Sequence, residues 1–347
     1  MEFRKNEVIV LLLLFISTFS FCVLFNYTST LEETKIVHPK PSVDHLLNLY
    51  NFRYTINNNA CNSLRPILVH SHVEHFKIRS ILRIAYPQSI LEKLGFQYIF
   101  MVGTPRSSEV QSQVILENSK FGDIVQGNFY EAYRNLTYKH IMALKWFHEY
   151  CSHSTYMIKI DDDIAVNLFK LNDIMKSKYQ LAGYIVKSKP IRDFNNKWYI
   201  SKQEFKSDYY PTFLSGWLYI ASRGTVAQLL RAIIPEKYFW IDDLFVTGFL
   251  AERAKIQKTD LSQEFETDPG PIYCCIKKKQ RCDFLAAPTG ENKNLLKEYP
   301  KQLIECKYKN KYCNYFQKSK FHHTCLDMWK INKDNRGRGI PKIEILH

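Results

Sequence analysis

Short apolar runs alternate along the chain with segments of helical periodicity. The runs at 66–70, 97–102 and 156–160 are rich in Ile, Val and Phe and are bounded by polar or turn residues, which is typical of buried strands. The segments 75–86 and 136–150 instead repeat their apolar residues about every 3.6 positions, as amphipathic helices do. This alternation predicts an α/β sandwich around a mostly parallel sheet.

Two further helices are predicted nearer the C-terminus. The first begins at Thr225 and ends before Pro235, whose ring removes a backbone donor and blocks the next turn. The second runs from Asp242 to Ala254, with apolar residues again on one face. No internal repeat is visible.

The N-terminus carries a hydrophobic segment of a different kind. Residues 8–25 contain no charge, and a helix of that length spans about 27 Å, close to the hydrocarbon thickness of a bilayer. A cleaved signal peptide is the alternative, but its apolar region is usually shorter. Arg4 and Lys5 precede the segment, and Glu32 and Glu33 follow it. The positive-inside bias therefore predicts a single-pass type II anchor with the bulk of the chain in the lumen.

These features predict four segments: a cytoplasmic tail at 1–7, a transmembrane signal-anchor at 8–25, a polar stem at 26–60 and one globular domain at 61–347. The composition of 46% hydrophobic and 24% charged residues supports a sizeable core and excludes general disorder. The net charge of +14 suggests nucleic acid as a partner. A membrane anchor argues against that partner.

Cysteine usage agrees with a luminal location. Cys22 lies in the apolar segment, and the spacings of the others fit no zinc pattern, so disulfides are the preferred interpretation. Their pairing stays open. Glycosylation sequons occur at Asn26, beside the membrane, and at Asn135. The remaining cysteines are Cys61, Cys151, Cys274, Cys275, Cys282, Cys306, Cys313 and Cys325.

Three consecutive carboxylates, Asp161, Asp162 and Asp163, directly follow the predicted strand 156–160. Alternate side chains of an extended chain point the same way, so Asp161 and Asp163 converge. At the carboxyl end of a parallel strand they would face the crevice where α/β folds bind ligands. Their hard oxygen atoms suit Mg²⁺ or Mn²⁺. A solvated acidic turn is the alternative, which the apolar sequence on both sides disfavours.

A second acidic pair, Asp242 and Asp243, begins the last predicted helix. Carboxylates at a helix N-terminus interact favourably with the helix dipole, which would be a purely structural role. The aromatic residues that precede the pair allow another role. A carboxylate beside apolar rings can have a raised pKa and take a proton from a hydroxyl group.

Six segments between residues 65 and 329 resemble, in order, the β-1,3-glycosyltransferases of glycosyltransferase family 31. Each motif is weak alone, but their shared order is specific. The closest match runs from Glu117 to Lys139 and resembles E-x-x-x-x-G-D-I-x-x-x-x-F-x-D-x-Y-x-N-L-T-x-K, with Asn128 and Glu131 as departures. The others are R-S-I-L-R-I-A-Y at 79–86, F-M-V-G at 100–103, K-I-D-D-D-I-A-V-N at 159–167, Y-P-T-F-L-S-G at 210–216 and I-D-D-L-F-V-T-G at 241–248.

The resemblance implies a GT-A fold: a Rossmann-like, mostly parallel sheet flanked by helices, which binds a nucleotide-sugar and a divalent metal. The implied substrate-binding residues are Arg79, Arg83, Lys139, Asp161 and Asp162. Cations at the first three positions would stabilise a departing UDP.

The resemblance also implies a metal site and a base. Asp163 is the first choice as metal ligand, together with Asp161 and a C-terminal histidine, His322 or the adjacent His323. The ion would be Mn²⁺ or Mg²⁺. Asp243 is the first choice as catalytic base, with Asp242 second. Trp217 replaces a small residue of the family and would narrow the acceptor pocket.

The function implied is that of a Golgi hexosyltransferase. It would transfer galactose or N-acetylglucosamine from UDP-galactose or UDP-N-acetylglucosamine to a glycan on a glycoprotein or glycolipid, in β-1,3 linkage with inversion. Asp242 leans slightly toward the N-acetylglucosaminyl branch.

Two other classes compete. Substitutions at Ala85, Tyr86, Asn128 and Trp217 would suit an inactive family member that binds glycans or acts as a chaperone. A metal-dependent nuclease or phosphatase would need a second set of ligands, for which only isolated candidates exist.

Overall fold

A computed structural model describes residues 44–47, 49–58, 61, 64–233, 237–279, 282–308 and 313. The predicted tail at 1–7, the anchor at 8–25, and His322 lie outside these residues. Within the described part of the chain, no helix has both the length and the apolar character needed to cross a bilayer.

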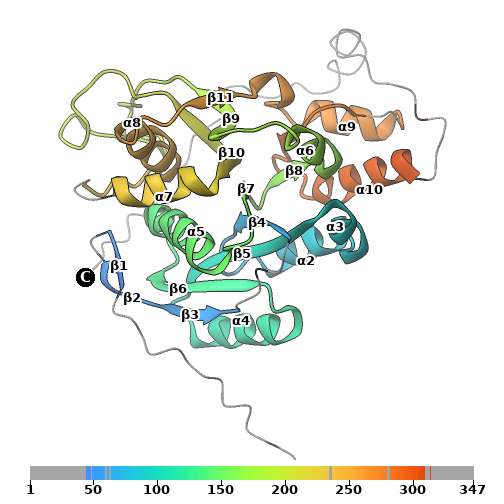
Figure 1. Cartoon of the computed structure of the whole chain (residues 1–347), viewed down its shortest axis with the longest axis horizontal. Coiled ribbons are helices and arrows are strands. Elements are labelled where there is room, and N and C mark those ends of the chain that lie inside the picture. Colours follow the sequence, from blue (N-terminus) through green and yellow to red (C-terminus); the bar gives the residue numbers. More distant parts are fainter. Residues whose placement is uncertain are drawn as a thin grey trace, which may run out of the picture. The chain divides into compact units, whose positions relative to one another are not determined.

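A mixed eight-stranded sheet forms the centre of the fold (Figure 1). The predicted α/β architecture with flanking helices is confirmed, but the sheet is less uniformly parallel than expected. β4 pairs in parallel with β5 and β7, whereas β10 runs antiparallel to both of its neighbours. The order is β11 (Lys258–Asp260), β9 (Leu181–Val186), β10 (Phe213–Ser222), β7 (Tyr156–Asp161), β4 (Arg65–His70), β5 (Phe96–Thr104), β6 (Ile124–Tyr130) and β3 (Tyr54–Asn57).

Helices cover both faces of this sheet and enclose two hydrophobic clusters (Figure 1). One face packs against α2 (Phe76–Ala85), α3 (Gln88–Leu94), α4 (Ser108–Phe121), α6 (Leu168–Ile174), α9 (Gly270–Lys277) and α10 (Leu295–Tyr308). The other packs against α5 (Leu136–Tyr150), α7 (Arg223–Ala232), η2 (Leu244–Leu250) and α8 (Ala251–Arg253).

Alternation along β7 shows how the sheet divides its side chains. Ile158 and Ile160 are buried in one cluster and Met157 in the other. Lys159 therefore points to the same face as Met157 and is itself buried. A buried ammonium is costly unless it is paired, so its partners mark a polar site.

The folded unit begins earlier than the sequence suggested. Residues 44–57 were assigned to the stem, but they form β1 (Asp44–Leu46), β2 (Leu49–Phe52) and β3. β3 pairs antiparallel with β6 and closes one edge of the main sheet. Asn128 on β6 also bonds to the backbone of Arg53 and Asn51. These strands are short and partly polar, so their pattern is too weak to identify them from sequence.

Disulfides are present, as predicted. They join Cys61 to Cys151, Cys275 to Cys282 and Cys306 to Cys313, and Cys274 is also disulfide-bonded. The expectation at Asn135 changes: its side chain is buried and donates a hydrogen bond to the Tyr130 carbonyl. An amide held in this way is not available for glycosylation in the folded protein.

Candidate active site

The aspartate triad lies where β7 ends and the chain turns toward β8 (Ile164–Val166). Asp161 accepts a hydrogen bond from the Lys159 ammonium at 2.6 Å. The Asp163 side chain is half exposed, and its nearest cation is Lys293, 3.8 Å from Oδ2. Thr289 bonds through its N–H and its hydroxyl to the Asp163 carbonyl and so fixes the backbone there.

Asp162 is turned away from these two carboxylates. Its Oδ2 lies 2.7 Å from the Ser71 hydroxyl and 2.8 Å from His75 Nδ1, just beyond the end of β4. Burial disfavours its charged form, but the two hydrogen bonds outweigh burial and lower the pKa of Asp162. Asp162 therefore holds the turn against the next strand, and Asp161 and Asp163 are left to face solvent.

Lys159 connects the triad to the second acidic pair. Its Nζ bonds to Asp161, donates to the Gly216 carbonyl at 2.7 Å, and lies 3.6 Å from Asp243 Oδ1. Burial lowers the ammonium's affinity for a proton, yet the surrounding carboxylates reverse that effect and raise the pKa of Lys159. It is a permanent cation between two predicted functional groups.

Asp243 is held by backbone as well as by charge. The Gly216 N–H donates to its Oδ2 at 2.7 Å, while Oδ1 has no hydrogen-bond partner among the described residues. Burial, reinforced by the charges of Asp242 and Asp161, raises the pKa of Asp243 well above its usual range. A Cβ atom at Gly216 would collide with this carboxylate, so the close approach requires glycine.

Asp242 faces a different environment. His140 Nδ1 lies 2.9 Å from its Oδ2, and His140 Nε2 lies 2.6 Å from the Tyr219 hydroxyl. Burial again favours the neutral acid, but the histidine bond and nearby Lys159 lower the pKa of Asp242. The pKa of Asp242 is therefore lowered, whereas the pKa of the adjacent Asp243 is raised. Opposite shifts of this kind are expected when only one of two carboxylates serves as a base.

A histidine beside this network could complete a second ligand group. His70, His140 and Asp242 bring one potential metal-ligating atom each within 4.8 Å of one another. Both His140 nitrogens are already hydrogen-bonded, however, and the pKa of His70 is lowered by burial and then by the charge of Lys159. Because both ring nitrogens of His140 are engaged, we interpret the group as a hydrogen-bonded network.

Asp161 and Asp163 fit a divalent cation better. They offer hard oxygen atoms, and Asp163 is open to solvent. Burial and the charge of Asp163 raise the pKa of Asp161, which indicates excess negative charge that a cation would neutralise. His322, the third expected ligand, lies outside the described residues.

The predicted nucleotide-binding cations are committed to protein partners. Arg79 is fully buried and directs its guanidinium to Glu117, the Ser71 hydroxyl and the carbonyls of His72 and Val73. It therefore has no donor left for a nucleotide. We correct its expected role to that of shaping the turn after β4.

Arg83 and Lys139 are similarly engaged. Arg83 pairs with Glu117 and with Asp123, both at 2.7 Å. Lys139 bonds to Glu131 and to the Ser71 carbonyl, both at 2.6 Å. Lys139 thus reaches the same turn as Asp162, while Arg83 lies farther along α2 and supports it indirectly.

Two substitutions that suggested an inactive protein have structural roles instead. The Tyr86 hydroxyl donates to the Val166 carbonyl at 2.8 Å and accepts the Leu168 N–H, so it supports the segment after the triad. Trp217 is half-buried on β10 and packs near Tyr184, with ring centroids 5.8 Å apart. Whether it meets an acceptor stays a prediction.

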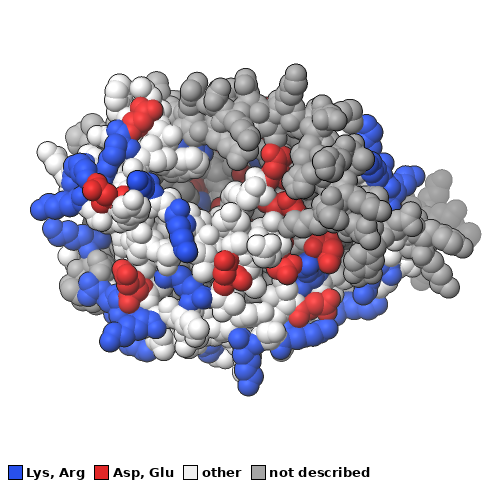
Figure 2. Space-filling model, turned by 90° about the horizontal axis from the view of Figure 1, so that it is seen from above, with Lys and Arg blue, Asp and Glu red and all other residues white. Residues whose placement is uncertain are grey.

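Sequence reasoning missed Lys159, His140 and Gly216 as site residues. Lys159 could have been found, because it is a lone charge in an apolar strand and lies two residues before Asp161, on the same face. His140 and Gly216 reach the site only through tertiary contacts. On the face seen in Figure 2, Lys and Arg are interspersed with Asp and Glu around the border, so the net charge does not form one basic patch there.

Together, the α/β fold and the carboxylate groups at the end of β7 and at the start of η2 define the site of a glycosyltransferase. The sequence profile described as galactosyltransferase matches residues 77–262, more than half of the chain. The chain belongs to this galactosyltransferase family.

Individual proteins that are similar to this chain are named beta-1,3-galactosyltransferases. Human beta-1,3-galactosyltransferase 5 is 27% identical over 241 residues, covering 66% of this chain and 77% of that protein. The mouse form is 32% identical over 194 residues, covering 54% and 63%. Mouse beta-1,3-galactosyltransferase 1 is 27% identical over 212 residues, covering 58% and 65%. A solved WbbM bifunctional glycosyltransferase shares 12% identity, with a TM-score of 0.38 and coverage of 74% of this chain and 51% of that chain, which is too distant to support further argument.

Proposed function

We propose that this protein is a UDP-sugar-dependent β-1,3-hexosyltransferase that inverts the anomeric carbon of the donor. Galactose is the favoured sugar, because the similar proteins named above are galactosyltransferases. N-acetylglucosamine is the second candidate, because an aspartate at position 242 slightly favours that branch of the family. The acceptor is a glycan carried by a glycoprotein or glycolipid, and the predicted location is the Golgi membrane with the folded unit in the lumen.

One observation carries the mechanism. Asp243 has a raised pKa, and its Oδ1 accepts no hydrogen bond from the described residues. This atom lies 3.6 Å from the ammonium of Lys159, which also contacts Asp161. In a single displacement, the acceptor hydroxyl attacks the anomeric carbon while the UDP–sugar bond breaks. The Asp243 carboxylate takes the hydroxyl proton, and Gly216 N–H and Lys159 keep the carboxylate in place.

The donor would be bound on the Asp161 and Asp163 side. These two residues would hold a Mn²⁺ or Mg²⁺ ion, with His322 as a further proposed ligand. When such an ion is bound, the chemistry it supplies is electrostatic stabilisation of the departing diphosphate. Asp162, Ser71 and His75 fix the turn on which the donor's ribose would rest.

The test is a transfer assay with the full-length chain in detergent. It is incubated with MnCl₂, a panel of UDP-sugars and glycans ending in galactose, N-acetylglucosamine or N-acetylgalactosamine. We expect UDP release and a product whose linkage, determined by NMR, is β-1,3. Donor and acceptor turnover with an α linkage would contradict inversion. Absence of transfer from every donor would contradict the proposed function.

A further inference from the structure

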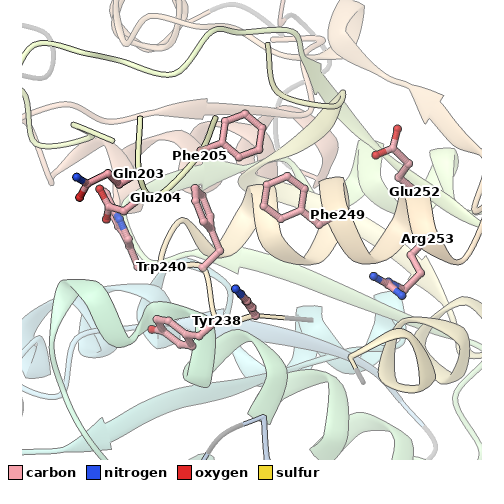
Figure 3. Close-up of a pocket in the computed structure, with 10 residues that line it drawn as sticks. Gln203, Glu204, Phe205, Tyr238, Trp240, Phe249, Glu252 and Arg253 are labelled. Atoms are coloured by element: carbon pink, nitrogen blue, oxygen red, sulfur yellow. The ribbon is translucent and has the colours of Figure 1, made fainter. Parts of the chain in front are cut away.

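A cavity of about 710 Å³ is lined in part by residues 237–240, which precede the second acidic pair, and no role assigned so far uses it. Its size is within the range of small-molecule sites. Figure 3 shows its arrangement: aromatic rings occupy the middle, Gln203 and Glu204 lie at one end, and Glu252 and Arg253 at the other. The aromatic lining residues are Phe205, Tyr238, Phe239, Trp240 and Phe249.

The rings form a preorganised wall. Phe205 stacks on Phe249 with centroids 5.7 Å apart (Figure 3). Phe239 meets Phe249 edge-on, with centroids 5.2 Å apart. Stacked and edge-on pairs hold one another in fixed orientations. Such a wall binds a flat apolar surface, and the carbon–hydrogen faces of a pyranose ring present one.

Polar groups accompany the rings. The Trp240 indole N–H is shielded from solvent, and no described residue accepts its hydrogen bond. The Arg134 guanidinium lies over the Trp240 ring at 4.7 Å and pairs with Glu204 at 3.6 Å, while its Nε atom also finds no partner within the described part of the chain. Glu204 itself lines the cavity, and its carboxylate accepts hydrogen bonds from the hydroxyl groups of a ligand.

The charges at the edge are balanced. The charged residues that line the cavity are Glu204, Glu252, Lys237 and Arg253, two of each sign. This balance favours a neutral ligand over an anionic one, because no excess of cations is available to pair with a carboxylate or sulfate group.

Aromatic side chains link the cavity to the acidic pair. Trp240 precedes Asp242 by two residues, and its ring lies 5.9 Å from that of Tyr133. Tyr133 is 43% exposed and shares a hydrogen bond with the side chain of Trp198, which is also partly exposed. Burial and the negative charges of Asp242, Asp243 and Asp161 raise the pKa of Tyr133 to about 12.

We propose that the aromatic cavity binds a neutral sugar unit of the acceptor, one or more residues distant from the sugar that receives the transfer. The reacting sugar would lie at Asp243, the chain would pass over Tyr133 and Trp198, and a further pyranose would occupy the cavity against Trp240. The preferred acceptor is then a neutral oligosaccharide, not a monosaccharide. This inference rests on the proposed transferase function.

The experiment compares two acceptors that share the same reacting sugar: a monosaccharide glycoside and a neutral tetrasaccharide. In the full-length chain, Trp240→Leu should raise the KM for the tetrasaccharide about five- to tenfold, a typical loss for one aromatic contact, and leave the KM for the monosaccharide unchanged. Glu204→Gln, at a partly exposed position, should act in the same direction without disturbing folding. Phe194→Ala is the control, since that ring is 75% exposed on the same loop and does not line the cavity.

Saturation-transfer NMR of the tetrasaccharide, in the presence of UDP and MnCl₂, separates the two proposals. One outcome is that the wild-type chain transfers sugar while Trp240→Leu and Glu204→Gln change the KM for the monosaccharide and for the tetrasaccharide by the same factor. In that case the cavity is not an acceptor subsite. If the tetrasaccharide binds the wild type, loses binding in Trp240→Leu, and yet is never glycosylated, the cavity binds glycans and the transferase proposal fails. A tetrasaccharide signal unchanged by both variants would overturn the inference whatever the activity.

Discussion

Lys159 Nζ lies 3.6 Å from Asp243 Oδ1, while the same ammonium bonds to Asp161. One buried cation thus connects the proposed donor side of the site with the proposed base. β7 and β10 are paired neighbours, so the sheet holds Lys159 beside Gly216, whose N–H in turn donates to Asp243.

Removing this cation should destabilise the fold. Lys159→Met leaves two partly buried carboxylates without their counter-charge, and we expect a loss of about 3 kcal/mol in the free energy of unfolding. Thermal unfolding of the full-length chain measures it. Lys176→Met, whose exposed ammonium pairs with Asp173, is the matched control and should cost no more than about 0.5 kcal/mol. Equal effects would show that Lys159 is not a structural cation.

Asp243→Asn tests the base. The amide preserves the shape of the side chain but cannot accept the hydroxyl proton, so kcat should fall at least about 10²-fold. UDP binding, measured by calorimetry, should change little because Asp243 lies on the acceptor side. Transfer within tenfold of wild type would remove Asp243 from this role.

The pH dependence should report the same group. A base works only when deprotonated, and burial raises the pKa of Asp243 well above that of an ordinary aspartate. As pH falls through this raised pKa, kcat/KM should decline, and the decline should begin at a higher pH than the usual aspartate range. In Asp243→Asn the residual rate should lose this limb. A wild-type profile that stays flat down to about pH 4 would contradict the assignment.

Asp163→Ala should abolish metal-dependent UDP binding. The Asp163 carboxylate is the most solvent-accessible of the triad. Asp161 does not replace it as a metal ligand, because its own carboxylate already accepts a hydrogen bond from Lys159. Calorimetric titration of UDP with and without MnCl₂ measures the effect. Asp173→Ala removes an exposed carboxylate elsewhere and should bind UDP as wild type does. Unaltered binding in Asp163→Ala would place the metal elsewhere.

Gly216→Ala should impair catalysis through geometry. The added methyl group would occupy the position of the Asp243 carboxylate, which must then leave its hydrogen bond to the backbone. We expect kcat to fall about 10²-fold or more, as in the loss of the base itself. Gly224→Ala is the control: its methyl group meets nothing within 4 Å, and in α7 alanine is favoured over glycine by about 1 kcal/mol. Equal activity of the Gly216→Ala and Gly224→Ala variants would contradict the tight contact between Gly216 and the Asp243 carboxylate.

Strong local patterns allowed much of the fold to be predicted from the sequence. The predicted strand 156–160 is β7, and the predicted helix 136–150 is α5 with the same bounds. The helix expected from Asp242 is instead a π-helix followed by a short α-helix, because its first residues are drawn toward β10 by Asp243 and by Thr247, whose hydroxyl bonds to Leu214. The transferase family, predicted from ordered motifs, is confirmed.

The site was harder to predict, because sequence shows a charge but not its partner. Arg79 and Arg83 were expected at the nucleotide, yet Glu117 and Asp123, more than 30 residues away, already pair with them. Asp162 and Asp163 are adjacent in sequence and face different surroundings. Such differences arise from which strand lies beside which, and that information is not local.

The pairing of β3 with β6 has a practical consequence for preparing this protein. A soluble version begun at Cys61, the boundary suggested by composition, would discard the strand that shields β6 and bare a row of unsatisfied amide groups. Such an edge recruits other chains, so we expect that version to aggregate. A version begun before Asp44 should remain monodisperse.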